Sequence, residues 1–268
     1  MNPQTLIFDL DDTLIECNKY FRDATNQFAE QMQIWFPDVS ENDIKAKQLE
    51  IDIKSIEIHG LNSSRFPESF VSAYQHYCKQ FKRETKESEM ERVRSIGLQV
   101  FQIEVEAFPY MYEVLNELQE DGHELYLFTG GDEANQSRKI IQLELETYFG
   151  DRVFIVTHKN TEALRKVLKT IKCDLRSTWM IGNSLRTDIS PALELGLNTI
   201  HIPSEIEWSY NNSLEANQPA LGKAMTIPSL RELPQFIRDN SYESCDFAGN
   251  LHGSETQNTL NSHNQADL

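Results

Sequence analysis

The chain opens with a short apolar run that passes directly into acidic residues: residues 5–13 are TLIFDLDDT. The consecutive apolar side chains of Leu6–Phe8 are typical of a buried strand. Asp9 and Asp11 follow without a spacer, so we expect them to lie where this strand ends. The string D-x-D-x-T is weak on its own, because short motifs recur by chance. Its position directly after a strand makes residues 9–13 a candidate functional site.

From about residue 106 the chain alternates between strand and helix patterns. We expect strands over Glu124–Thr129, Val153–Thr157, Trp179–Ile181 and Asn198–Ile202. Helices are expected over Ala134–Leu145, Thr161–Ile171 and Ile189–Leu195, after an earlier helix that Pro109 opens and Gly122 ends. Strands and helices in alternation with short connections form right-handed βαβ units. The sequence therefore predicts an α/β fold with a parallel sheet.

Residues 16 to about 105 carry helix patterns instead. Apolar side chains at helical spacing form two stripes, first Phe21, Phe28, Met32 and Trp35, then Phe70, Val71, Tyr74, Tyr77, Cys78 and Phe81. Between the stripes, Ser40–Asp43 has the form of a capping box that opens a helix, and Pro67 suits the first turn of the next helix. Residues 49–58 partly alternate, which leaves a strand open there, but the length and the cap favour a helix. We expect a small helical bundle.

The overall composition argues against several classes of protein. The chain has 25 Lys and Arg against 42 Asp and Glu, a net charge of −17 over 268 residues. Such a chain repels phosphate backbones and anionic lipids, so we expect no nucleic-acid or membrane partner. The longest apolar runs have four residues, whereas a membrane span needs about 20. No signal-peptide pattern is present, and the cysteines match no metal or redox spacing, so the expected location is cytoplasmic.

The length and these patterns predict two domains and a tail. Residues 1–15 and 106–240 are expected to form the core that contains the sheet, and residues 16–105 the helical domain. Residues 241–268 are rich in Ser, Thr, Asn, Gln and Gly and contain no Lys or Arg. Because so polar a segment buries little apolar surface, we expect it to be disordered.

Polar residues follow the other expected strands as well. They are Thr129 and Gly130 after one strand, Lys159 after the next, and Asn183 and Asp188 after the third. Thr129 and Lys159 are 30 residues apart, and Lys159 and Asp188 are 29 apart, so each interval is one βα unit. Parallel sheets bind ligands at the carboxyl ends of their strands. We therefore expect these side chains and Asp9 to meet at one edge of the sheet.

This set of side chains suits the transfer of a phosphoryl group. A carboxylate can attack phosphorus and form an acyl phosphate, which divides the reaction into two steps. A second carboxyl group can protonate the leaving alcohol and later activate water. A hydroxyl, a lysine and glycine amides can hold the phosphoryl oxygens. A divalent ion such as Mg²⁺ would offset the repulsion between the anionic nucleophile and the anionic substrate.

In these motifs the sequence resembles the haloacid dehalogenase superfamily. The matching stretches are FDLDDT at 8–13, the apolar run that ends in Thr129, Lys159 after a strand, and GNSLRTD at 182–188. The resemblance covers about residues 1–240 and implies a Rossmann-like core with a C1-type helical cap and a Mg²⁺ cofactor. It also implies roles: Asp9 as nucleophile and metal ligand, Asp11 as general acid/base with its carbonyl on the metal, Thr129, Gly130 and Lys159 as phosphoryl-binding residues, and Asp188 as metal ligand.

One position departs from the superfamily pattern. The fourth motif usually has an acidic residue after its glycine, and here that residue is Asn183. An amide oxygen can still bind Mg²⁺, so Asn183 stays a candidate ligand, but it brings no charge. This departure implies a weaker metal site, or a site in which Asp188 carries more of the binding.

The function that follows is Mg²⁺-dependent hydrolysis of a small phosphorylated metabolite through an aspartyl-phosphate intermediate. A phosphomutase of the same fold and a non-catalytic binding protein stay open as alternatives, the second only because of Asn183. A 2-haloacid dehalogenase is disfavoured, because those relatives lack the acid two positions after the nucleophile, which is Asp11 here. Singly, Asp11 and Asp12 could also be turn residues, and Thr13 and Asp188 helix N-caps. Nothing identifies the substrate, although Arg65 could reach a substrate anion.

Overall fold

The computed structural model describes residues 2–212 and 222–241 of the protein. Its central feature is a parallel sheet with the strand order β3-β2-β1-β4-β5-β6. The strands are β1 (Thr5–Phe8), β2 (Glu124–Gly130), β3 (Val153–Val156), β4 (Thr178–Gly182), β5 (Asn198–His201) and β6 (Ala224–Thr226). β1 pairs with β2 on one side and with β4 on the other. The predicted α/β fold with a Rossmann-like parallel sheet is confirmed.

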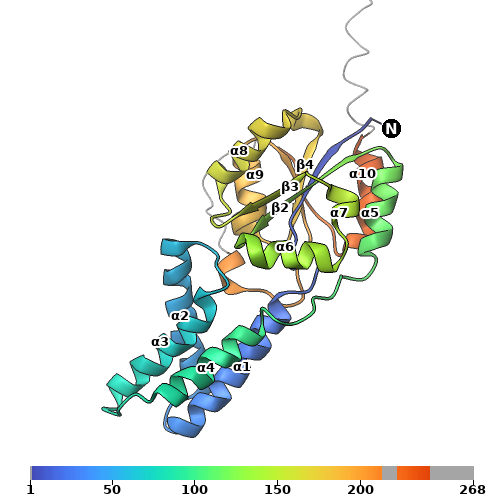
Figure 1. The fold of residues 1–268 in the computed structure, drawn as a ribbon. Coiled ribbons are helices and arrows are strands. Elements are labelled where there is room, and N and C mark those ends of the chain that lie inside the picture. Colours follow the sequence, from blue (N-terminus) through green and yellow to red (C-terminus); the bar gives the residue numbers. More distant parts are fainter. Residues whose placement is uncertain (1, 213–221, 242–268) are drawn as a thin grey trace, which may run out of the picture.

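Alternate residues of β1 face opposite sides of the sheet, and helices cover both sides (Figure 1). Leu6 and Phe8 pack in one cluster with side chains from α5, α6, α7 and α10, whereas Ile7 packs in another with side chains from α8 and α9. These helices are α5 (Met111–Glu120), α6 (Glu133–Gln142), α7 (Glu146–Phe149), α8 (Thr161–Ile171), α9 (Ser190–Glu194) and α10 (Leu233–Ser241). Because both faces are covered, functional groups of the core must gather at the strand ends.

Two helices differ from the prediction. The helix expected over Ala134–Leu145 ends at Gln142, because Glu144 adopts a left-handed conformation with φ of 51° and α7 follows. The helix expected over Ile189–Leu195 begins earlier, with a π-helical turn over Leu185–Ile189. The Ser184 side chain accepts a hydrogen bond from the backbone N–H of Thr187 at 3.1 Å and so starts that turn. Strand β6 and helix α10 were not predicted.

Four helices form the bundle that extends away from the sheet in Figure 1: α1 (Asn18–Trp35), α2 (Glu41–His59), α3 (Arg65–Gln80) and α4 (Glu87–Gln99). They bury a hydrophobic cluster of their own around Phe28, Phe70 and Tyr74. Residues 49–58 are helical, so the strand left open there is absent, and Ser40 caps α2 as expected. The separate cluster supports the proposal that this insert is a domain of its own, which we call the cap.

Asp12 joins the core to the cap. It has a left-handed φ of 60°, and its carboxylate accepts hydrogen bonds from the backbone N–H groups of Cys17 at 3.1 Å and Asn18 at 2.9 Å. These N–H groups lie at the start of α1 and have no partner within the helix, so Asp12 caps α1. The expected tail at 241–268 lies outside the described residues, apart from Ser241 at the end of α10.

Candidate active site

The carboxyl ends of three strands bring Asp9, Lys159 and Asp188 into contact. Asp9 follows β1, Lys159 follows β3, and Asp188 lies in the π-helical turn after β4. The Lys159 ammonium forms ion pairs with the Asp9 carboxylate and with Asp188, the latter at 2.6 Å. All three side chains are buried. The structure therefore brings these three residues together at one edge of the sheet, as expected.

The Asp9 carboxylate is held on both oxygens. Oδ1 contacts Lys159, and Oδ2 accepts a hydrogen bond from the Thr13 hydroxyl at 2.9 Å. The same hydroxyl accepts from the backbone N–H of Asn183 at 3.1 Å. Burial raises the pKa of Asp9 and Lys159 opposes that shift. Burial alone would lower the pKa of Lys159, but the nearby carboxylates of Asp188 and Asp9 raise it, so the lysine stays charged.

Asp11 has a different set of partners, all from α6. Its carboxylate lies 2.7 and 2.8 Å from the Lys139 ammonium and accepts a hydrogen bond from Gln136 at 3.1 Å. Gln136 also donates to the Thr129 hydroxyl at 2.6 Å, so one amide links the second carboxylate to the end of β2. Lys139 and Gln136 are buried. Neither residue was predicted from the sequence, although two polar residues on the buried face of a helix, next to Ile140, are a usable signal.

Two glycines allow close approaches around this site, and Asp188 requires the one at Gly182. A Cβ atom at Gly182 would lie 2.3 Å from Asp188 Oδ2, so only glycine lets that carboxylate pack against the end of β4. A Cβ atom at Gly130 would lie 2.6 Å from the Leu61 side chain of the cap. Asp188 Oδ2 in turn accepts a hydrogen bond from the backbone N–H of Ser184 at 2.9 Å. These contacts keep Asp188 facing Lys159.

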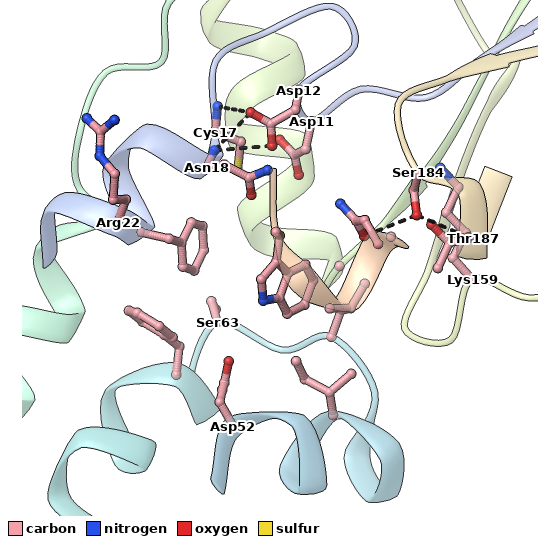
Figure 2. A pocket seen from close by; sticks show the side chains of 18 of the residues that line it. Asp11, Asp12, Cys17, Asn18, Arg22, Asp52, Ser63, Lys159, Ser184 and Thr187 are labelled. Atoms are coloured by element: carbon pink, nitrogen blue, oxygen red, sulfur yellow. Dashed lines mark hydrogen bonds between the residues drawn. The ribbon is translucent and has the colours of Figure 1, made fainter. Parts of the chain in front are cut away.

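A cavity of about 560 Å³ lies between the core and the cap and connects all the candidate residues. Its core side includes Asp9, Asp11, Thr129, Gly130, Lys159, Asn183 and Asp188. The cap contributes Arg22, Lys45, Asp52 and Arg65, among others. Figure 2 shows Asp11 and Asp12 on one side of this space and Asp52 on the other. A ligand that fills this cavity would therefore touch both domains.

Asp52 of α2 is a buried carboxyl group in this cavity without a protein partner among the described residues. Its side chain is only 7% exposed, and no described residue donates a hydrogen bond to it or forms an ion pair with it. Burial alone raises the pKa of Asp52 from 3.8 to about 7. No sequence signal marked this residue.

We expect Asp52→Asn to stabilise the protein increasingly as the pH rises. Between about pH 4 and pH 7 the folded state binds a proton at Asp52 that the unfolded state does not, so wild-type stability falls with rising pH over this window. The asparagine does not titrate, so the gain in unfolding free energy should grow by on the order of 2 kcal/mol from pH 5 to pH 8. Urea unfolding at both pH values measures this. The matched control is Glu57→Gln on the exposed side of α2; an equal gain in both variants would contradict the expectation.

Comparison with known proteins defines the class. The sequence profile of haloacid dehalogenase-like hydrolases matches residues 3–196, and the chain belongs to this family of hydrolases. Two similar proteins are named glyceraldehyde 3-phosphate phosphatase. One, from Pyrococcus abyssi, is 31% identical over 97 residues, 34% of this chain and 40% of that protein. The other, from Methanocaldococcus jannaschii, is 27% identical over 136 residues, 49% of this chain and 57% of that protein.

The match thus spans about half the length of these relatives. A solved structure of a haloacid dehalogenase-like family hydrolase from Xanthomonas campestris has the same fold. Its TM-score is 0.74 at 24% identity, and the alignment covers 90% of this chain and 93% of that one. None of the helices in the described residues is both long and apolar enough to cross a membrane.

Proposed function

We propose that this hydrolase is a Mg²⁺-dependent phosphatase of small phosphomonoesters that forms an aspartyl-phosphate on Asp9. One observation carries the proposal: the Asp9 carboxylate is buried at the end of β1, fixed by Thr13 and Lys159, and shares its cavity with Asp11. A carboxylate held in this way needs little reorganisation before it attacks phosphorus. The presence of Asp11 beside it supports a phosphatase over a dehalogenase.

In the first step an oxygen of Asp9 attacks phosphorus, the bond from phosphorus to the alcohol oxygen breaks, and Asp11 gives that oxygen a proton. In the second step Asp11 takes a proton from water, whose oxygen attacks phosphorus. Asp9 then leaves as a carboxylate, and inorganic phosphate is released. Thr129, the backbone N–H of Gly130 and Lys159 hold the phosphoryl oxygens in both steps.

The charges and donor atoms around Asp9 fit a divalent cation. Asp9 and Asp188 share one ammonium, which leaves a net charge of −1 that a cation would offset. Asn183 is buried, and its side chain makes no hydrogen bond with the described residues. Among those residues, no three His, Cys, Asp or Glu side chains form a metal site by themselves. The remaining ligands would be the Asn183 amide oxygen and the Asp11 carbonyl, hard oxygen donors that suit Mg²⁺. Bound Mg²⁺ would reduce the repulsion between Asp9 and the substrate phosphate.

The test is phosphate release with and without Mg²⁺. p-Nitrophenyl phosphate serves as the general substrate, and EDTA removes the cation. A panel of phosphorylated metabolites then ranks substrates by kcat/KM, and glyceraldehyde 3-phosphate belongs in it because two relatives carry that name. Mg²⁺-dependent release supports the proposal. Release that EDTA does not reduce, or no release from any member of the panel, contradicts it.

We expect Asn183→Asp and Asp188→Asn to shift the Mg²⁺ requirement in opposite directions. The first variant adds a negative charge at the proposed ligand position, so the half-saturating Mg²⁺ concentration should fall, on the order of tenfold. The second removes one and should raise that concentration by a similar factor or more. The measurement is kcat/KM against Mg²⁺ concentration for wild type and both variants. If Asn183→Asp leaves the curve where it was, Asn183 is not a metal ligand.

A further inference from the structure

The face of α2 that packs inward has an unusual composition. Its buried residues are Ile44, Gln48, Asp52 and Ile56, each one turn from the next. A helix that only supports a core would be expected to carry apolar residues at all four positions. Instead, two polar residues lie in the middle of this face. Of the apolar residues in 49–58, only Ile56 is buried on this face, which explains why their spacing alone left a strand open.

The two polar residues differ in what they contact. Gln48 donates a hydrogen bond to the Ser69 hydroxyl at 2.8 Å, and Ser69 donates to the carbonyl of Phe66 at 2.6 Å. Gln48 is therefore satisfied within the cap. Asp52, one turn further on, has no such partner among the described residues. Burying most of a carboxyl group without a protein hydrogen-bond donor destabilises the fold, so its presence at the edge of the cavity calls for a role other than packing.

The Asp52 side chain points into the cavity and not into the cap core (Figure 2). It lines the cavity that contains Asp9 and Asp11, and Figure 2 shows it projecting from α2 into the open space. The phosphoryl group would occupy the core side, beside Lys159. What reaches the cap is then the alcohol part of the substrate.

The surrounding charges restrict the group that Asp52 can accept. Arg22, Lys45 and Arg65 line the same cavity. They are three cations against one carboxyl group on the cap side of the lining, so this side disfavours a substrate with an ammonium group, while Asp52 itself disfavours a second carboxylate close to it. A neutral hydroxyl group avoids both repulsions and donates the hydrogen bond that Asp52 lacks.

We propose that Asp52 determines specificity by accepting a hydrogen bond from a hydroxyl group on the leaving alcohol, so that hydroxylated phosphomonoesters are the substrate class. This inference rests on the proposed phosphatase function. An alcohol without the hydroxyl leaves Asp52 buried and unpaired, which penalises its transition state relative to that of the hydroxylated substrate.

The experiment compares two substrates that differ only in hydroxyl groups, glycerol 3-phosphate and propyl phosphate, at saturating Mg²⁺ and at pH 8, above the pKa of about 7 that burial gives Asp52. We expect wild type to prefer glycerol 3-phosphate in kcat/KM by at least about tenfold, the discrimination typical of one charged hydrogen bond. Asp52→Leu should reduce this preference by about tenfold or more. Asp52→Asn keeps the shape of the side chain and one acceptor atom, so its substrate preference should lie between those of wild type and Asp52→Leu.

Glu57→Leu is the matched control, because Glu57 is an exposed carboxylate on the same helix and lies outside the cavity. It should keep the wild-type preference. Thermal unfolding of each variant checks the fold, and a ratio of two substrates does not change merely because less protein is folded. A preference that survives in Asp52→Leu, or a wild type without preference, overturns the role of Asp52 and leaves the phosphatase proposal standing. If wild type hydrolyses neither ester nor p-nitrophenyl phosphate, both proposals are wrong.

Discussion

Asp9→Asn is expected to lower kcat by at least about a thousandfold, because an amide is a far poorer nucleophile than a carboxylate. The substitution keeps the shape of the side chain and its hydrogen bond with Thr13. Lys159 keeps Asp188 as an ion-pair partner, so the fold should persist. Phosphate release measures the loss, and circular dichroism with thermal unfolding checks the structure.

The matched control for this variant is Asp12→Asn. Asp12 lies in the same loop, but its carboxylate caps α1 and has no role in the proposed reaction. Because asparagine also caps helices, this control should retain most of its turnover. Beryllium fluoride, which mimics an acyl phosphate, should bind to wild type and protect it against thermal unfolding but should not protect Asp9→Asn. Near-wild-type turnover in Asp9→Asn would exclude Asp9 as the nucleophile.

The sheet and the residues at its edge could be predicted because their signals are local. A short apolar run that ends in a polar residue marks both a buried strand and the place where its functional group lies, as in Leu6–Phe8 followed by Asp9. The spacing of one βα unit then relates Thr129, Lys159 and Asp188, since parallel strands end at a common edge. None of these inferences requires knowledge of how the helices pack.

The residues that escaped prediction depend on helix packing. Lys139 resembles any surface lysine until α6 is laid against the end of β1, where its ammonium meets Asp11. Asp52 is one of five acidic residues in α2, and only two apolar residues, Ile44 and Ile56, share its buried face. The buried face of a helix is identified from apolar residues at helical spacing. A polar residue on that face interrupts this spacing, so the sequence does not show that the residue is buried. Functional residues on helices are therefore harder to find than those at strand ends.

Asp11→Asn is expected to lower kcat for an alkyl phosphate by about 10²–10⁴-fold, the usual contribution of a general acid/base. The variant also leaves the buried Lys139 without its carboxylate partner, which destabilises the fold by about 3–5 kcal/mol.

The double variant Asp11→Asn/Lys139→Met separates the two effects. Removing both charges should recover most of the lost stability, because methionine fills the space without a buried charge. If Asp11 acts in the chemistry, turnover stays low in the double variant although its melting temperature recovers. If the double variant regains both stability and turnover, Asp11 is only a structural partner of Lys139. The same conclusion follows if kcat of the single variant Asp11→Asn falls by less than about threefold.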